Sequence, residues 1–467
     1  STWPRAWRKR NRVVSAHVNS CVRVYLIKLT AILCDTSSQS TMALIRCMNN
    51  RIALVCVDLV YMYETKDGGG FDKVQLTIPE ETAENTSDRD SDEEEDSKSS
   101  AKKDKQEEPS FSCANFSPCS TYFMAVTNSK RLIVWKRHSP GNWEAIFQRH
   151  VARKSIQVRM CSTKDTVLVA DRSGDVYSFN LDDAEVTGGK LVIGRLSMVL
   201  DMVIGEQDNF LAVSDRDEKI QVSCYPNCYN IRTFCLGHTQ FVTCLALLPG
   251  PPELLVSGSG DGTIRTWCPE TGRQLHRYEV SIEKQAGDTK ENVESRKPAV
   301  KRLALQPSGT TMACLIDELP EVLLLGWQGP KAGWSRLQSL AVPCTPDDVA
   351  FDDDGQLWVT LTSPPSVQLF AHSTDSNGQW RRLEVPAELS SAGEPSWAPL
   401  LKDVSSTLCQ SLQGKPAIAN GNNGSLARLY KQWFDNEHSY LEKKRRRLEE
   451  AAAASAPKRL KQEPTLS

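Results

Sequence analysis

A recurring spacing of about 44 residues constrains this chain more than any other feature of its sequence. Seven strand-like stretches end at Tyr63, Trp135, Phe179, Ser223, Trp267, Trp327 and Phe370. The successive steps are 72, 44, 44, 44, 60 and 43 residues. Each of the two long steps holds a polar segment, at 80–108 and at 283–300, and without these segments the steps return close to 44. A fixed period of this length is typical of a fold built from stacked structural repeats.

The clearest repeat runs from Gly237 to Trp267 and reads GHTQFVTCLALLPGPPELLVSGSGDGTIRTW. It contains a Gly-His pair, an alternating apolar strand, a strand of small residues, an Asp-Gly turn and a closing strand that ends in Trp. This order is the signature of a WD-repeat blade. The Asp-Gly turn between two runs of period two independently predicts a β-hairpin.

Seven repeats predict an all-β chain, with a seven-bladed WD-repeat β-propeller over 42–385. A four-stranded blade cannot bury both of its faces alone, so neighbouring blades must cover each other in a ring. No segment before residue 400 shows sustained helical periodicity. The sequence leaves two ways to close the ring, by a strand from 42–57 or by one after residue 380.

The segments outside the propeller differ in composition. Residues 1–41 show no blade pattern and no signal-peptide cleavage site, and we expect an extension or an artefact of the gene model. Residues 386–424 are rich in Ser, Gly, Pro and Asn, which predicts closing loops or a linker. Helical spacing over 425–450 predicts a C-terminal helix, and 451–467 read as a disordered basic tail.

Charge is distributed unevenly, although the net charge is only −2. Residues 80–108 hold thirteen acids against five bases, which indicates a disordered, solvated insert, whereas 443–461 hold eight bases against two acids. The fifteen cysteines form no disulfide or zinc framework, and we expect reduced cysteines in an intracellular protein and no metal. No apolar run is long enough to span a membrane, so no membrane partner is expected.

Motifs of catalysis are absent from the sequence, which contains no G-x-S-x-G, H-E-x-x-H or Walker A pattern. The stretch GSGDG at 258–262 resembles a phosphate loop, but it does not precede a helix. The residue types of a hydrolytic triad occur at His238, Ser257 and Asp261. In a WD blade these types form a buried hydrogen-bond chain with Trp267, so we predict a structural network and no catalytic residue.

Several stretches resemble the WD-repeat subunit of the eukaryotic tRNA (guanine-N7)-methyltransferase. They are VLVADRSGDVYSF (167–179), LAVSDRDEKIQVS (211–223), FCLGHTQFVT (234–243), LLVSGSGDGTIRTW (254–267) and LYKQWFDNEHSYLEKK (429–444). The resemblance runs from about Phe111 to Lys444. Its most specific part is the pair VADRSGDVYSF and SDRDEKI, 44 residues apart, which generic WD repeats do not share.

The resemblance implies a non-catalytic scaffold. In that family the propeller forms a heterodimer with a Rossmann-type catalytic subunit that uses S-adenosylmethionine, and together they methylate N7 of a guanine in the tRNA variable loop. We therefore expect this chain to bind and stabilise the catalytic subunit and to help seat tRNA. No cofactor is expected on the chain itself, since S-adenosylmethionine would be bound by the partner.

Two turns of adjacent blades carry the expected partner contacts. Arg172 lies in ADRSGD, and 216–219 form the equivalent turn of the next blade. Charges of both signs on neighbouring tips suit a charged partner surface, whereas solvated turns are the alternative. The family usually places a basic residue at Gln221, so either the contact is weaker in this chain or Lys219 or Arg172 carries the ion pair. The full set is Arg172, Arg216, Asp217, Glu218, Lys219 and Gln221.

The basic run 443–447 allows two interpretations. Phosphate binding would be electrostatic and independent of sequence, and it would use Lys443, Lys444, Arg445, Arg446 and Arg447. The second interpretation is a nuclear localisation signal, which we favour for the run 457–461. We therefore expect a nuclear protein.

Two other classes of function compete with the scaffold. One is a generic nuclear WD adaptor, either a ubiquitin-ligase substrate receptor or a chromatin-associated platform. The other is a propeller enzyme, which would need titratable residues that converge on the central channel, and the sequence does not force any there.

Overall fold

The computed structural model describes twelve stretches of the chain, 43–65, 71–79, 109–183, 188–194, 197–281, 297–362, 365–373, 378–383, 397–412, 426–431, 441 and 444–447. The expected extension 1–41, the acidic insert 80–108 and the tail 451–467 lie outside these residues. The chain divides into two compact units, 1–428 and 429–467, and each is considered by itself.

The described part of the first unit contains seven four-stranded antiparallel sheets, named blades 1 to 7 in chain order. Blades 1 to 3 comprise β1 (Leu44–Met48), β2 (Arg51–Val55), β3 (Leu59–Thr65), β4 (Phe71–Thr77), β5 (Phe111–Phe116), β6 (Tyr122–Thr127), β7 (Arg131–Ser139), β8 (Asn142–His150), β9 (Ser155–Met160), β10 (Thr166–Asp171), β11 (Val176–Asn180) and β12 (Lys190–Ile193). Blades 4 to 7 comprise β13 (Val199–Ile204), β14 (Phe210–Asp215), β15 (Ile220–Cys224), β16 (Ile231–Cys235), β17 (Val242–Leu248), β18 (Leu254–Ser259), β19 (Thr263–Trp267), β20 (Gln274–Glu279), β21 (Val300–Leu305), β22 (Thr311–Ile316), β23 (Glu321–Trp327), β24 (Trp334–Ala341), β25 (Asp348–Phe351), β26 (Leu357–Thr362), β27 (Pro365–His372) and β28 (Trp380–Leu383).

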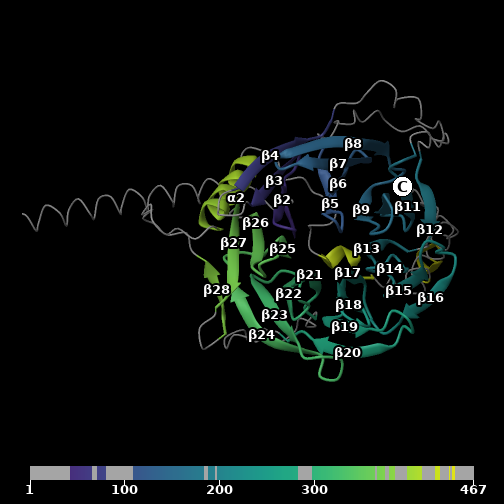
Figure 1. Cartoon of the computed structure of the whole chain (residues 1–467). Coiled ribbons are helices and arrows are strands. Elements are labelled where there is room, and N and C mark those ends of the chain that lie inside the picture. Colours follow the sequence, from purple (N-terminus) through teal and green to yellow (C-terminus); the bar gives the residue numbers. More distant parts are fainter. Residues whose placement is uncertain are drawn as a thin grey trace, which may run out of the picture. The chain divides into compact units, whose positions relative to one another are not determined.

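The blades are arranged in a ring, with the first strand of each blade innermost and the fourth at the rim (Figure 1). Each first strand contacts the first strand of the next blade, and β1 contacts β25, which closes the circle. The seven residues that mark the 44-residue period all lie on third strands. The predicted seven-bladed WD-repeat propeller is therefore confirmed.

Packing between blades builds the hydrophobic core as seven clusters, one at each junction of neighbouring blades. The alternation of side chains along β10 illustrates the rule. Val167 and Val169 belong to the cluster with blade 2, whereas Leu168 and Ala170 belong to the cluster with blade 4. Because both faces of the strand are covered, it reads as an uninterrupted apolar run rather than an alternating one.

The ring closes without an exchanged strand. Blade 1 and blade 7 each consist of four consecutive strands, so neither a strand from 42–57 nor one after residue 380 crosses to the other blade. Polar contacts join the two blades instead. The backbone N–H of Ile45 donates to Asp348 Oδ2 at 3.1 Å, and Thr360 Oγ1 donates to the carbonyl of Ala43 at 3.2 Å.

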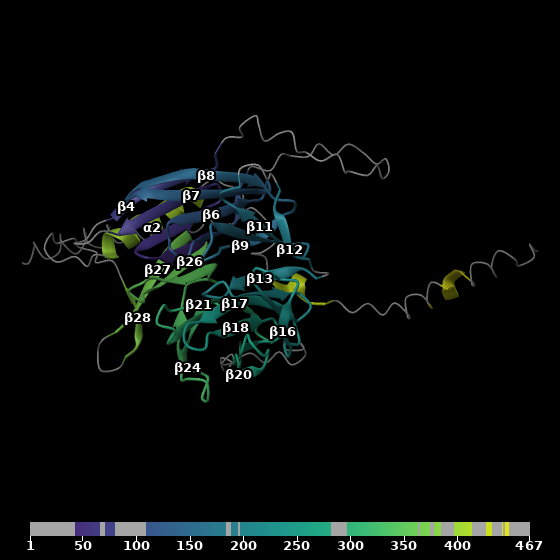
Figure 2. The same cartoon turned by 45° about the vertical axis from the view of Figure 1, so that its right-hand side comes forward.

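A helix that the sequence analysis missed covers this junction. Helix α2 (Trp397–Leu412) lies in the segment predicted as closing loops or a linker, so that prediction is wrong for these residues. Both views place α2 beside β4, β26 and β27 (Figures 1 and 2). Its side chains Leu400, Leu401, Val404 and Leu408 join the cluster that blades 1 and 7 share.

Hydrogen bonds fix α2 against blade 1. Tyr63 Oη donates to Thr407 Oγ1 at 2.9 Å, and Lys73 Nζ lies 2.7 Å from Asp403 Oδ2. The helix thus adds contacts at this junction, where the described residues of the first and last blades are joined by packing and by side-chain hydrogen bonds rather than by a shared strand.

Two further boundaries differ from the sequence prediction. The polar segment 283–300 ends earlier than expected, because Ala299 is buried and Val300 begins β21. The predicted helix 425–450 does not begin as an α-helix. Residues Leu426–Leu429 form a 3₁₀ turn whose first N–H is held by Asp317 Oδ2 at 2.9 Å, and Tyr430 and Lys431 are not helical.

In the second unit, the described residues 441 and 444–447 are helical and exposed. Across the described stretches of both units, no helix is long and apolar enough to cross a membrane.

We expect Leu408→Ala to weaken the closure of the ring. Leu408 is fully buried between blades 1 and 7, and a cavity left by Leu→Ala in a core costs about 2–5 kcal/mol. Urea denaturation should show this loss, and hydrogen exchange should show the largest loss of protection in β1 and β27. Lys402→Ala, on the exposed side of the same helix, is the matched control. Equal stability of the two variants would contradict the proposed role of α2.

Candidate functional site

The turn between β10 and β11 is shaped by one buried carboxylate. Asp171 Oδ1 accepts the backbone N–H groups of Ser173, Gly174 and Asp175 at 2.8, 3.0 and 3.0 Å. Asp171 itself is only 2% exposed. Because this side chain is used inside the turn, the exposed charged group at its tip is Arg172.

The next blade has the same arrangement, a buried Asp at the end of its second strand that accepts a backbone N–H of the turn. Asp215, at the end of β14, is buried and accepts the N–H of Lys219 at 2.9 Å. Glu218 takes a left-handed conformation with φ of 72°, which lets the chain reverse within four residues. The structure therefore brings Arg216, Asp217, Glu218 and Lys219 together on one turn, with Lys219 exposed and the other three half-buried.

Both turns lie on the same face of the propeller. The N–H of Arg172 donates to the carbonyl of Lys154 at 3.0 Å, and the N–H of Arg216 donates to that of Met198 at 2.9 Å. Each turn thus lies beside the chain that leads into the first strand of its own blade. Five of the six expected partner contacts are placed on neighbouring turns, as the sequence predicted.

The sixth residue, Gln221, is not on the turn. It lies in β15, is 9% exposed, and its Nε2 donates to Ser223 Oγ at 2.9 Å. The amide is therefore oriented by its own strand, and the exposed basic groups of the two turns are Arg172 and Lys219.

An apolar rim on the outer strand of blade 4 was not found from the sequence. Tyr229, Ile231, Phe234 and Leu236 are 87, 49, 39 and 62% exposed, and they lie on or next to β16, the outermost strand of blade 4. Gln221 pairs with Phe234 across the sheet, which places Phe234 and Leu236 close to the charged turn. Polar and apolar residues alternate along an outer strand. The sequence alone does not tell whether its apolar side chains are exposed for binding or covered by other parts of the chain.

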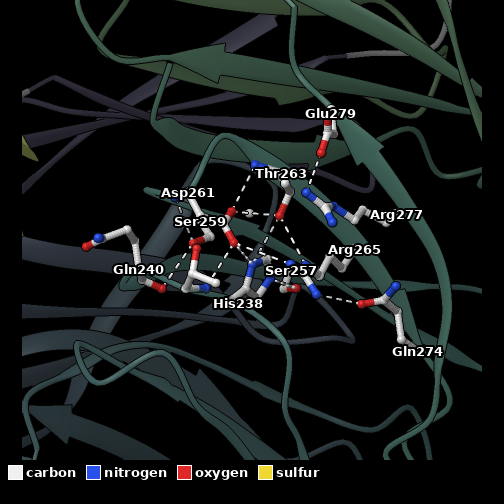
Figure 3. Close-up of polar contacts among 12 residues, drawn as sticks. His238, Gln240, Ser257, Ser259, Asp261, Thr263, Arg265, Gln274, Arg277 and Glu279 are labelled. Atoms are coloured by element: carbon white, nitrogen blue, oxygen red, sulfur yellow. Dashed lines mark hydrogen bonds and ion pairs between the residues drawn. The ribbon is translucent and has the colours of Figure 1, made fainter. Parts of the chain in front are cut away.

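The predicted blade network is present in blade 5, and Figure 3 shows its members His238, Ser257 and Asp261. His238 lies between two partners, with Nδ1 3.0 Å from Asp261 Oδ2 and Nε2 2.8 Å from Ser257 Oγ. Trp267 Nε1 donates to the same Ser257 Oγ at 2.8 Å. These contacts join the loop before β17 to β18 and β19, so all three are fixed relative to one another.

Burial sets the charge state of this network. Burial lowers the pKa of His238 below its usual value, despite the neighbouring Asp261. Burial alone would raise the pKa of Asp261, but hydrogen bonds from His238, Thr263 and the N–H of Thr239 hold it well below its usual range. The pair is thus a neutral imidazole that donates to a carboxylate. Its third member is a Ser hydroxyl that is 0% exposed and bonded to a Trp, which leaves no nucleophile open to a substrate.

Titratable residues do meet on the innermost strands of the ring, although the sequence does not force any there. Asp201 on β13 accepts Gln157 Nε2 from blade 3 at 2.7 Å and the N–H of Leu245 from blade 5 at 2.8 Å. Asp348 forms ion pairs with Arg46 from blade 1 and, at 3.7 Å, with Arg302 from blade 6. These carboxylates partner backbone and side-chain donors of the innermost strands, so their arrangement serves assembly of the ring.

The remaining site predictions involve the tail and metals. Lys444, Arg445, Arg446 and Arg447 are exposed on one helical turn, whereas Lys443 lies outside the described residues. No group of three or more His, Cys, Asp or Glu side chains could hold a metal ion in the part that the structure describes. The cysteines in that part form no disulfide.

The family model of the tRNA methyltransferase TRM82 WD40 domain matches residues 72–188 and 185–384. A Danio rerio protein named tRNA (guanine-N(7)-)-methyltransferase non-catalytic subunit wdr4 is 36% identical over 373 residues, 78% of this chain and 84% of its own length. The Homo sapiens protein of the same name is 35% identical over 71% of this chain and 75% of its own length. A Drosophila melanogaster protein, named as the non-catalytic subunit wuho, is 29% identical over 72% of this chain and 74% of its own length. The prediction that the chain is not itself an enzyme agrees with these names.

Solved structures support the fold alone. The WD40 repeats of RRP9 superpose with a TM-score of 0.52 at 13% identity, covering 70% of this chain and 88% of that one. The Cps50 (Swd1) β-propeller domain gives 0.51 at 12% identity, covering 70% of this chain and 95% of that one.

Removal of one hydroxyl should destabilise blade 5. Ser257→Ala leaves Trp267 Nε1–H and His238 Nε2 without partners in a buried site, and each such group costs about 1–3 kcal/mol. We expect a loss of about 2–4 kcal/mol in the free energy of unfolding, measured by urea titration. Ser173→Ala, on an exposed turn, should change stability by less than about 0.5 kcal/mol. A similar small change at Ser257 would show that the network does not stabilise the blade.

Stability should also fall in mild acid. The pKa of His238 is lower in the folded chain than the value of about 6.5 in the unfolded chain. Between these two values only the unfolded state takes up a proton, so stability is complete above pH 6.5 or so and is lost as the pH falls below it. Urea titrations at several pH values give the free energy of unfolding as a function of pH. This free energy should fall less steeply in acid for His238→Gln than for the unchanged chain. His150→Gln, at an exposed site, should keep the original slope, and the idea fails if all three slopes agree.

Proposed function

Since this chain belongs to the family of the tRNA methyltransferase TRM82 WD40 domain, we propose that it is the scaffold subunit of a tRNA (guanine-N7)-methyltransferase. It binds and stabilises a catalytic subunit that uses S-adenosylmethionine, as a heterodimer, and helps seat tRNA for formation of N7-methylguanosine in the variable loop. The observation that carries the proposal is the 36% identity over 78% of the chain to a protein named as such a subunit.

The geometry supports a role in binding rather than chemistry. The polar groups of the blade network and of the channel are engaged by internal partners within the described residues. S-adenosylmethionine is therefore assigned to the catalytic partner.

The turns of blades 3 and 4 are the proposed contact with the catalytic subunit. They present Arg172 and Lys219 beside Asp217 and Glu218, on a frame that the buried Asp171 and Asp215 hold rigid. Rigid charges of both signs fix the register of a complex. The neighbouring apolar rim, around Phe234 and Leu236, supplies area that gains from burial.

The basic helical turn 444–447 and the outlying run 457–461 support nuclear localisation and contact with tRNA phosphates. Four adjacent cations attract any polyanion without regard to sequence.

The experiment that tests the proposal is co-expression of the full chain with the catalytic subunit, followed by size exclusion and methyl transfer to tRNA. Reversal of charge by Asp217→Lys and Glu218→Lys should break a one-to-one complex and lower methyl transfer to the level of the catalytic subunit alone. We expect a rise in Kd of about 100-fold, because misplaced like charges at an interface cost several kcal/mol.

The matched control is Asp182→Lys with Asp183→Lys, two exposed acids at the opposite end of β11. This control changes the net charge by the same amount and should leave the complex intact. No co-elution of the unchanged chain, or catalytic activity that does not depend on it, would sink the proposal and leave a generic WD adaptor.

A further inference from the structure

Three cations cluster where blade 2 meets blade 3, on the face that carries the charged turns. Lys130 is exposed at the turn between β6 and β7, and Arg153 and Lys154 lie in the connection from β8 to β9, with Arg153 exposed and Lys154 half-buried. We call Lys130, Arg153 and Lys154 the basic strip.

Backbone hydrogen bonds fix the spacing of this strip. The N–H of Val151 donates to the carbonyl of Lys130 at 2.8 Å, and the N–H of Arg172 donates to that of Lys154 at 3.0 Å. Between Val151 and Lys154 the chain spans at most about 11 Å. The three cations are therefore held within a short path that ends at Arg172.

The three cations of the strip have no acidic partner among the described residues, in contrast to some other cations of the surface. Elsewhere Arg232 lies 3.1 Å from Glu270, and Lys73 lies 2.7 Å from Asp403. Among the described residues, no carboxylate lies within ion-pair distance of Lys130, Arg153 or Lys154. The nearby Asp171 is buried, and its Oδ1 accepts three N–H groups of its own turn.

We propose that the basic strip binds the phosphate backbone of the tRNA substrate while the adjacent turns hold the catalytic subunit. This inference rests on the proposed function and deepens it. A protein surface usually presents both signs of charge, which the turn 216–219 matches. A phosphate backbone presents one sign only, which the basic strip matches. Contact with the backbone alone imposes no requirement on the RNA sequence.

The test compares the triple variant Lys130→Ala, Arg153→Ala, Lys154→Ala with the unchanged chain, each in complex with the catalytic subunit. The probe is an unmodified tRNA transcript that carries the variable-loop guanine. We expect an intact complex, an unchanged kcat and a KM for tRNA that rises about tenfold at 0.1 M salt. The slope of log affinity against log salt should become shallower by about 2 to 3, one phosphate contact per lost cation.

The control variant removes the same charge elsewhere, at Arg381, Arg382 and Lys402, on β28 and the exposed side of α2. It should leave KM and the salt slope unchanged. An equal effect of both variants, or no effect of the strip variant, would overturn the inference. Release of the catalytic subunit by the strip variant would also overturn it, because the strip would then contact protein.

Failure of the proposed function gives a different result. If the unchanged chain does not form the complex, the two variants can still be compared as isolated chains. Binding of the same transcript is then measured by retention on filters. A strip-dependent salt slope there would support the RNA contact without the scaffold, and equal slopes would overturn it.

Discussion

Burial of both faces of every blade by its neighbours is the constraint on which the rest of this structure depends. A single four-stranded sheet with two apolar faces has no stable state in water, so the blades are stable only as a ring. The seven clusters at the junctions show that the core is divided equally around the circle. Every junction must therefore be closed, and the one between blades 1 and 7 is the junction where no single stretch of chain runs from blade to blade. The apolar side of α2 and the carboxylate of Asp348 meet that need.

The same constraint explains what could be predicted from the sequence. Second strands covered on both faces are continuous apolar runs, and third strands end at the same place in each blade, so the period of 44 residues was readable. The turns at Arg172 and 216–219 were placed correctly because Asp171 and Asp215 shape them locally, through hydrogen bonds within four residues. Local interactions leave a local signature in the sequence.

What could not be predicted depends on contacts between distant residues. Helix α2 contains Ser405, Ser406 and Thr407, which are weak helix formers, and its stability comes from the junction that it covers. The charges in the channel are brought together from blades 1, 3, 4, 6 and 7, and no spacing along the chain reveals that Asp348 meets Arg46. The burial of Gln221 also follows from its neighbours, because an exposed turn and the start of a covered strand are only two residues apart.

A rigid ring has a consequence for how one chain can serve two macromolecules at once. The turns and the basic strip are linked by the hydrogen bond between Arg172 and Lys154, so a protein bound to one and an RNA bound to the other are held at a fixed separation. Neither contact needs to be strong, because a bound catalytic subunit raises the effective concentration of its active site near any RNA on the strip. The different charge patterns of the two surfaces then oppose exchange of the two ligands. The acids Asp217 and Glu218 on the mixed-charge turns repel phosphates, whereas the strip has no acids to pair with the cations of a protein partner. A scaffold without catalytic groups can in this way increase the rate of a reaction by position alone.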